Sequence, residues 1–143
     1  MIVYEEEIKF NKEDLRKLFS SVNWNSSKYP DKLFKAIENS TYKIFAYNGD
    51  RIVGLITGIS DGSINLFISY LLVDPSYQKM GIGKTLLNKM IKKGDFNRIQ
   101  LITEIKNKEF YLKNGFTKDG IGMFKIKWWY INYYIFSGSD SIW

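Results

Sequence analysis

Two glycines and two lysines in the middle of the chain have the spacing of a site for an anionic group. Gly81 and Gly83 lie between an apolar run and an amphipathic stretch, and Lys79 and Lys84 flank them. Glycine lets the backbone turn with positive φ and lets a ligand approach the main chain closely. The free N–H groups at a helix start, together with the positive end of the helix dipole, favour a phosphate. Residues 78–85 are therefore expected to bind a phosphorylated ligand.

Two common phosphate-binding patterns do not describe this loop. The dinucleotide-binding fingerprint G-x-G-x-x-G needs a third glycine at position 86, which is Leu86. The P-loop pattern G-x-x-x-x-G-K-[ST] matches at its end, but its first glycine is replaced by Gln78. A P-loop protein would also carry the loop after its first strand, whereas four strand-like runs precede it here. Neither nucleotide-binding motif is predicted.

The chain contains no cysteine and no histidine. These absences exclude a disulfide framework, a thiolate metal site, a Ser-His-Asp triad and a histidine general base. A thiolate-ligated or histidine-ligated metal is therefore excluded, and no metal is expected. Acid–base chemistry has to come from Glu, Asp, Tyr, Lys or water. The composition suits a reaction that needs no covalent nucleophile.

Two motifs resemble those of the GNAT superfamily of N-acetyltransferases, in its small, bacterial-type, single-domain form. Residues 78–83, Q-K-M-G-I-G, fill the pattern [RQ]-x-x-G-x-[GA] after a strand that ends V-D-P. Residues 110–116, F-Y-L-K-N-G-F, fill the pattern F-Y-x-K-x-G-F at the usual distance. The resemblance covers roughly residues 2–127. It implies an acyltransferase that moves an acetyl group from the cosubstrate acetyl-CoA to a primary amine by direct attack in a ternary complex.

The resemblance also implies roles for individual residues. The backbone N–H groups of residues 79–85 would bind the pyrophosphate of coenzyme A. Leu71 and Val73 would offer main-chain groups to the thioester carbonyl and the pantetheine arm, and Tyr111 would protonate the departing thiolate. The residues expected to bind the cofactor are Leu71, Leu72, Val73, Gln78, Lys79, Met80, Gly81, Ile82, Gly83, Lys84, Thr85 and Asn107.

The sequence departs from the family pattern on its catalytic side. Many members have an asparagine seven residues before the tyrosine, where this chain has Glu104, so Asn107 is the substitute. Many also have a carboxylate as general base near Ser69 or Tyr70, and neither of these residues is acidic. Glu104 is then the nearest candidate base, acting through water; the alternative is a solvated carboxylate or helix cap. For Tyr111 the alternative is a core aromatic residue.

Periodicity and turn signals predict the elements that position these residues. An N-G and a D-G dipeptide between strand-like runs indicate tight turns, so residues 43–73 are expected to form an antiparallel meander. A strand–loop–helix–strand unit over residues 64–102 predicts a parallel pair joined by a right-handed crossover. The fold class is α/β, with a mixed antiparallel and parallel sheet and helices on both faces. The resemblance implies that this is the GNAT-like acyl-CoA N-acyltransferase fold.

The remaining elements are predicted from the same signals. Asn11 is expected to cap one helix, and Pro30 to begin the next. Apolar residues that alternate with lysine predict one or two strands over residues 116–127. The other expected elements are strands over 2–7 and 98–103 and helices over 83–93 and 107–113.

The length of 143 residues predicts a single domain over residues 1–143. Its core is expected over residues 2–127, followed by an aromatic C-terminal extension over residues 128–143. The extension is too short to span a bilayer; covering a sheet edge, lining the acceptor cleft and forming a dimer contact remain open for it. The start of the chain does not read as a signal peptide, and no run of 18 apolar residues occurs. A cytoplasmic protein without a membrane partner is expected.

The net charge of +6 suits an anionic partner. No helix-turn-helix pattern or RNP-type strand supports nucleic-acid binding, so no nucleic-acid partner is expected. The alternative from another class is a CoA-binding module without catalysis, used as a sensor or an interaction domain. The acceptor is expected to be a small-molecule or protein amine, whose identity the sequence leaves open, as it does a homodimer.

Overall fold

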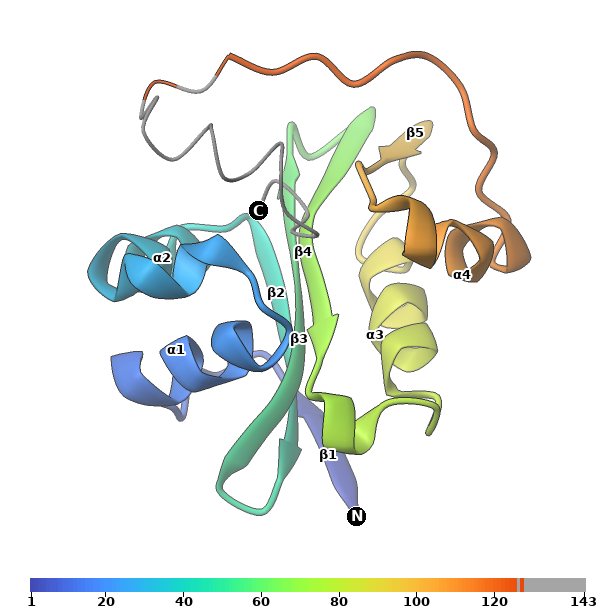
Figure 1. Ribbon diagram of the computed structural model, residues 1–143. Helices are drawn as coiled ribbons and strands as arrows, with labels where there is room; N and C mark the ends of the chain where they lie inside the picture. The colour runs from blue at the N-terminus through green and yellow to red at the C-terminus, as the bar shows by residue number, and fades with distance from the viewer. Residues whose placement is uncertain (126, 128–143) are drawn as a thin grey trace. The chain divides into compact units, whose positions relative to one another are not determined.

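The structure is a computed structural model that describes residues 1–125 and 127 of the chain (Figure 1). The chain divides into two compact units, Met1–Leu101 and the part from Ile102 onward, each with its own internal contacts. The predicted aromatic extension, residues 128–143, lies outside the described residues. Its role stays a prediction, as does the single domain. No helix in the described part of the chain is long and apolar enough to cross a membrane.

The first unit is built on a five-stranded sheet whose strands lie in chain order. The first three neighbouring pairs are antiparallel, and the last pair is parallel because a helix crosses between its strands. The predicted meander and the predicted parallel pair are therefore confirmed. The elements of this unit are β1 (Ile2–Glu5), α1 (Lys12–Ser21), η1 (Asn25–Lys28), α2 (Pro30–Glu38), β2 (Tyr42–Asn48), β3 (Arg51–Ser60), β4 (Asn65–Val73), η2 (Pro75–Tyr77), α3 (Ile82–Ile91) and β5 (Arg98–Gln100).

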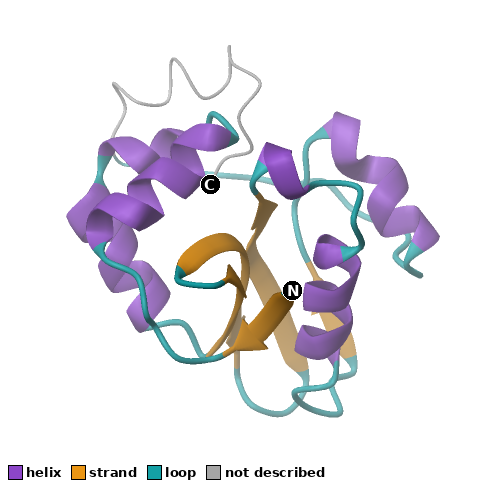
Figure 2. Ribbon diagram, turned by 90° about the horizontal axis from the view of Figure 1, so that it is seen from below, coloured by secondary structure: helices purple, strands orange, loops and turns teal. Residues whose placement is uncertain are grey.

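Helices cover both faces of this sheet, as predicted. Figure 1 and Figure 2 show α1 and α2 on one face and α3 on the other. On the first face, Phe19 of α1 and Ile37 of α2 pack in one buried cluster with Phe45 and Leu55 of the sheet. The apolar stripe of α3 repeats at helical spacing and covers the opposite face. Its buried residues are Ile82, Leu86, Leu87 and Met90.

Local signals set the starts of the first two helices. The side chain of Asn11 accepts a hydrogen bond of 2.8 Å from the N–H of Asp14. The carboxylate of Asp14 accepts one of 3.1 Å from the N–H of Asn11, which completes a capping box. Pro30 is the first residue of α2, where its missing N–H costs nothing. Both predicted starts are confirmed.

Strand β4 changes its pairing along its length. Its first residues, Asn65–Phe67, pair with β5, and Leu66 and Phe67 also pair with β3. From Ile68 to Val73 it pairs with β3 alone among the described strands. The register with β3 shifts at Ser69, the extra residue of a β-bulge, and a bulge bends a strand and increases its twist. The second half of β4 therefore has one edge without a strand partner in the described part of the chain.

The second unit contains η3 (Ile105–Asn107) and α4 (Lys108–Lys113). The prediction of a short helix over residues 107–113 is confirmed, and Gly115 follows it with a φ of +89°. The prediction of strands over residues 116–127 is wrong for 116–125 and 127, which form no strand. Alternating apolar and lysine side chains make a segment amphipathic, but a strand also needs a hydrogen-bonded neighbour. Periodicity carries no information about that neighbour.

Candidate active site

The second half of β4 directs main-chain groups toward its unpartnered edge. The N–H of Asp74 donates to the carbonyl of Val53 over 2.8 Å, which fixes the alternation of hydrogen-bonded positions. Alternate residues of an antiparallel strand turn their main-chain groups toward the neighbour. The groups of Leu72 therefore face β3, whereas those of Leu71 and Val73 face away from it. The side chain of Leu72 is buried in the core, and a cofactor role for these three residues stays a prediction.

The loop between β4 and α3 contains two residues in the left-handed conformation. Lys79 has a φ of +64° and Gly81 a φ of +82°, a region that glycine adopts without strain. The side-chain amide of Gln78 donates to the carbonyl of Val73 over 3.0 Å and ties the first residue of the motif to the strand end. The carbonyl of Gly81 then accepts bonds from the N–H and the hydroxyl of Thr85, over 3.0 and 2.9 Å, at the start of α3.

The first turn of α3 offers main-chain donors to a ligand. Gly81 is the N-cap, and no side chain in the described part of the chain caps this end. The N–H groups of Ile82, Gly83 and Lys84 have no carbonyl four residues earlier within the helix. The positive end of the helix dipole lies at the same place. Ile82 is buried and anchors this turn in the core, so the donors are held on a rigid element.

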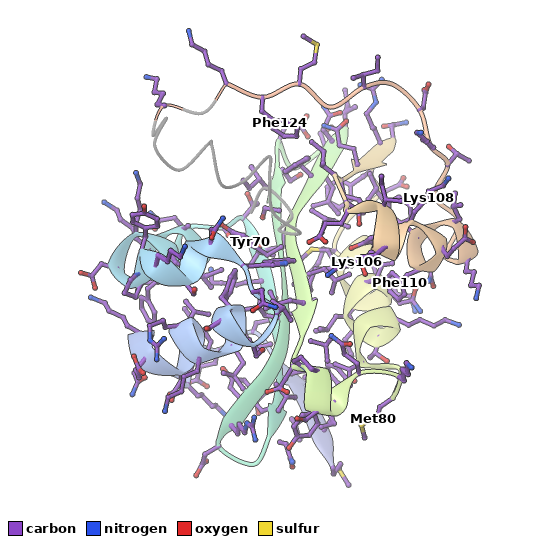
Figure 3. The ribbon with its side chains drawn as sticks, viewed as in Figure 1. Tyr70, Met80, Lys106, Lys108, Phe110 and Phe124 are labelled. Atoms are coloured by element: carbon purple, nitrogen blue, oxygen red, sulfur yellow. The ribbon has the colours of Figure 1, made fainter. Side chains whose placement is uncertain are left out.

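The side chains around this turn are exposed and basic. Lys79 and Lys84 are both exposed. Met80 is 63% exposed, and its side chain points away from the sheet (Figure 3). An anion at the helix start would be attracted by both lysines, to an extent that salt reduces. The described residues include no group of three or more Asp or Glu side chains that could hold a metal ion.

The bulge of β4 carries hydroxyl groups rather than carboxylates. The hydroxyl of Ser69 lies 2.8 Å from that of Thr57. Tyr70 reaches from β4 toward η1, where its ring lies 6.0 Å from that of Trp24 (Figure 3). Burial raises the pKa of Tyr70, and a hydrogen bond with Ser26 lowers it to a smaller extent. A tyrosine that is protonated at neutral pH is not a general base, so neither Ser69 nor Tyr70 replaces the missing carboxylate.

In the second unit, Tyr111 lies in an aromatic cluster formed by its own motif. Its ring is 5.0 Å from Phe110 and 5.7 Å from Phe116, both in edge-to-face geometry. The carbonyl of Tyr111 accepts a bond of 3.0 Å from the N–H of Phe116. Burial raises the pKa of Tyr111 to about 12. The hydroxyl is therefore protonated at neutral pH and can act as a proton donor.

Glu104 and Asn107 lie at the two ends of η3. The carbonyl of Glu104 accepts a bond of 3.0 Å from the N–H of Asn107. The carboxylate of Glu104 is 3.3 Å from the ammonium group of Lys106, and its side chain is only 11% exposed. Asn107 precedes α4, but its side chain makes no capping bond. The lysine partner of Glu104 is a feature that the sequence pattern did not predict.

Asp74 and Arg51 are two further residues beside the loop that the sequence analysis missed. Asp74 was expected only to end the strand, yet it is buried and its carboxylate accepts a bond of 2.8 Å from the guanidinium group of Arg51. An Asp-Pro dipeptide indicates a strand end. It says nothing of a partner that lies 23 residues earlier in the chain.

A comparison with protein families and with curated proteins gives matches over most of the chain. The model of the acetyltransferase (GNAT) family matches residues 9–116. A histone acetyltransferase of Glycine max is 33% identical, over 84% of this chain and 57% of that protein. The uncharacterised N-acetyltransferase ycf52 of Gracilaria tenuistipitata var. liui is 34% identical, over 84% of this chain and 69% of that protein. The chain thus spans little more than half of the Glycine max protein.

Solved structures give the same result for the fold. A GNAT family acetyltransferase from Streptococcus pneumoniae superposes with a TM-score of 0.71 at 33% identity, over 89% of this chain and 97% of that one. A probable acetyltransferase from Staphylococcus aureus superposes with a TM-score of 0.78 at 24% identity, over 88% and 99%. Since the family model also covers well over half of the residues, the chain belongs to the GNAT family of acetyltransferases.

Proposed function

We propose that the protein transfers an acetyl group from acetyl-CoA to a primary amine by direct attack of the amine in a ternary complex. The observation that carries this proposal is a strand edge followed, after residues 74–81, by a helix start; within the described part of the chain the edge has no strand partner and the helix start has no side-chain cap. The helix start suits a pyrophosphate. The strand edge suits an extended arm that contains amides, such as pantetheine, which can bond to main-chain groups as an added strand does. The N-acetyltransferases among the relatives support the same reaction.

The main-chain groups of Leu71 and Val73 are proposed to hold the thioester end of the ligand. When an amine attacks a thioester, negative charge develops on the carbonyl oxygen. A fixed N–H donor stabilises this charge, and loss of one such donor costs roughly 2.7–4 kcal/mol in other enzymes. The carbonyl of Val73 already accepts a bond from Gln78, but an amide oxygen has a second lone pair that can accept from pantetheine.

Tyr111 is proposed to donate the proton that the leaving group needs. Breaking the bond between carbon and sulfur leaves the electron pair on sulfur, and the thiolate then takes a proton. A donor for this step has to be protonated at neutral pH, as the Tyr111 hydroxyl is, and burial, which raises its pKa to about 12, keeps it so while making it a weaker acid than a free tyrosine. The proposal rests on the complete F-Y-x-K-x-G-F motif, residues 110–116, whose aromatic side chains pack around the Tyr111 ring.

Glu104 and Asn107 are proposed for the two remaining tasks. A carboxylate can accept, through one water molecule, the proton that the attacking amine loses, and Glu104 is the acidic residue at the position where relatives often have asparagine. The side-chain amide of Asn107 makes no capping bond, so it has donors and an acceptor to offer to the pantetheine arm.

The second candidate function is a CoA-binding module without catalysis. The hydroxyl-bearing residues Ser69 and Tyr70 at the β4 bulge favour it, because they provide no strong base. The two candidates differ in turnover and not in CoA affinity. Loss of thioester from acetyl-CoA, measured over a broad panel of small amines, amino acids and peptide amines, separates them. Tight CoA binding without turnover on any amine would favour the binding module.

The variant Tyr111→Phe tests the catalytic proposal directly, because it removes only a hydroxyl. We expect kcat to fall by roughly 10²–10⁴-fold, the usual effect of losing a general acid, while CoA affinity and thermal stability change little. Tyr42→Phe is a matched control in the first unit, where the ring packs edge-to-face on Phe96, and its kcat should be unchanged. A Tyr111→Phe enzyme with unchanged kcat, assayed where chemistry limits the rate, would show that Tyr111 is a core aromatic residue.

A further inference from the structure

We infer that a side-chain network between the hairpin of β2 and β3 and the segment after β4 positions the phosphate-binding loop and thereby sets the affinity for CoA. Its members are positioning residues, because they act through the loop rather than on the ligand. The inference rests on the proposed function of residues 78–85. The four residues of the network are Asn48, Arg51, Asp74 and Tyr77.

Asp74 is the centre of the network and joins three segments of the chain. Its N–H donates to Val53 of β3, which fixes it to the sheet. Its carboxylate accepts a bond of 2.8 Å from the N–H of Ser76 and another of 2.8 Å from Arg51. Its carbonyl accepts a bond of 2.8 Å from the N–H of Tyr77. A carboxylate with only 10% of its side chain exposed needs such partners, because burying an unpaired charge is costly.

Tyr77 receives a second set of contacts from the same hairpin. The guanidinium carbon of Arg51 lies 5.6 Å from the centre of the Tyr77 ring, within the range of a cation–π interaction. The side-chain amide of Asn48 donates to the Tyr77 hydroxyl over 2.8 Å. Asn48, the last residue of β2, and Arg51, the first residue of β3, thus both contact Tyr77, the last residue of η2.

The loop that follows η2 has little support of its own. Gln78 is bonded through its N–H to Pro75 and through its side chain to Val73. After it come the left-handed Lys79 and Gly81, and then the helix. If the start of the loop moved, the amides of the first turn would keep their place, but those of residues 79–81 would not. Holding a loop in its binding conformation raises affinity because less ordering is needed on binding.

The geometry also separates this network from an ordinary surface ion pair. The pair of Arg16 with Glu13 on α1 has a similar distance, 2.6 Å, but both side chains are exposed and lie one turn apart on the same helix. Such a pair contributes little to stability. Arg51 is also exposed, at 61% of its side chain, but its partner is the buried carboxylate beside the loop. The Arg16 pair therefore provides a matched control.

The test is a double-mutant cycle on CoA affinity, measured by calorimetry with the full chain. We expect Arg51→Ala and Asp74→Ala each to weaken CoA binding by about tenfold, since a hydrogen bond to a charged group is lost. The double variant should be weakened no further than the stronger single variant, because the two residues act together. Arg51→Lys should restore part of the affinity, and Arg16→Ala should leave it unchanged.

Kinetics distinguish positioning from a general loss of structure. In Arg51→Ala the KM for acetyl-CoA should rise about tenfold while kcat stays near the wild-type value. If Asp74→Ala does not fold, Tyr77→Phe takes its place, since it removes only the bond from Asn48. A smaller rise in the CoA dissociation constant is then expected.

The outcomes separate the two proposals. Unchanged CoA affinity in folded Arg51→Ala, or additive effects in the cycle, would overturn the positioning role while leaving the proposed function in place. A wild-type protein that does not bind CoA would overturn the proposed function itself.

Discussion

Strand β4 lies between two aspartates, and the turns that they organise are supported in different ways. Before the strand, the carboxylate of Asp61 accepts three main-chain hydrogen bonds of 2.8–3.0 Å, from Ser63, Ile64 and Asn65. All these donors lie within four residues of it. After the strand, the carboxylate of Asp74 accepts one local bond, from Ser76, and one from Arg51, 23 residues away.

This difference distinguishes the two ends of the strand by the distance in sequence over which their aspartates are supported. The bonds to the Asp61 carboxylate are all local, so this side chain organises its turn without a distant partner, although Ile64 of the same turn also accepts a main-chain bond of 2.9 Å from Arg98. The loop after Asp74 is also bonded to another hairpin, through Arg51 and Asn48, so part of its support is present only once those strands have paired. Loops that carry function are in general positioned by a rigid scaffold, and distant support of this kind would serve residues 78–85 in their proposed role.

Glycine substitutions provide the strongest test of this contrast. Gly62 and Gly81 have φ values of +78° and +82°, and an added Cβ would meet no atom within 4 Å at either position. Valine should therefore cost both sites a similar backbone strain, on the order of 1–2 kcal/mol. We expect Gly81→Val to lose measurable CoA binding by calorimetry while the protein remains folded, and Gly83→Val to do the same.

Gly62→Val is the matched control for backbone strain. It should lower the melting temperature about as much as Gly81→Val and leave CoA affinity unchanged. Equal CoA affinity in the two variants would mean that residues 78–85 do not bind the ligand, and the contrast between the two ends of β4 would lose its functional meaning.

Ionic strength should also affect CoA affinity, but less than the glycine substitutions do. The loop after β4 carries Lys79 and the first turn of α3 carries Lys84, whereas residues 60–65 carry only the negative charge of Asp61. CoA affinity should therefore fall as ionic strength rises, because exposed charges are screened. Lys84→Gln should reduce this salt dependence, and Lys35→Gln on α2 should not. An affinity that is the same at low and high salt would contradict electrostatic binding of the phosphates.

The smallest expected effect is on the stability that the turn before β4 provides, and it is expected at low pH. Main-chain bonds, that of Asn65 first, lower the pKa of Asp61 from 3.8 to about 2. A lowered pKa in the folded state means that the ionised group stabilises the fold above pH 3.8, and that this contribution disappears as the pH falls toward about 2.

The variant Asp61→Asn keeps an acceptor oxygen in the turn but does not titrate. Urea unfolding of both proteins should therefore show a difference in unfolding free energy at pH 5 that narrows between about pH 4 and pH 2. A difference that stays constant over this range would show that the carboxylate charge does not stabilise the turn.

The sequence predicts those parts of the fold that depend on local chemistry. The N-G and D-G turns, the Asn11 cap and the start at Pro30 are decided by neighbouring residues, and all of them are confirmed. The expected strands at 116–127 depended on a partner strand, which alternation cannot supply. Residues 116–125 and 127 form none.

In the site, too, features set by neighbouring residues were predicted, and features that depend on distant parts of the chain were not. The Q-x-x-G-x-G motif predicts a glycine turn before a helix, and Gly81 makes that turn. The left-handed Lys79 was not predicted, because lysine rarely adopts this conformation. The pairing of Arg51 with Asp74 was not predicted either, because it follows from how the strands align rather than from residue type. The bulge that turns Ser69 and Tyr70 is likewise set by the register with β3.

The agreement between strand order and chain order has a consequence for folding kinetics. The meander of β2, β3 and β4 closes through two tight turns, whereas β1 pairs with β2 across two helices, as in the pairing of Ile2 with Asn48. Short loops close at a lower entropic cost, so the meander is expected to form the folding nucleus. Asp61→Ala should then mainly slow refolding, and Val3→Ala in β1 should mainly speed unfolding, as measured by stopped-flow fluorescence.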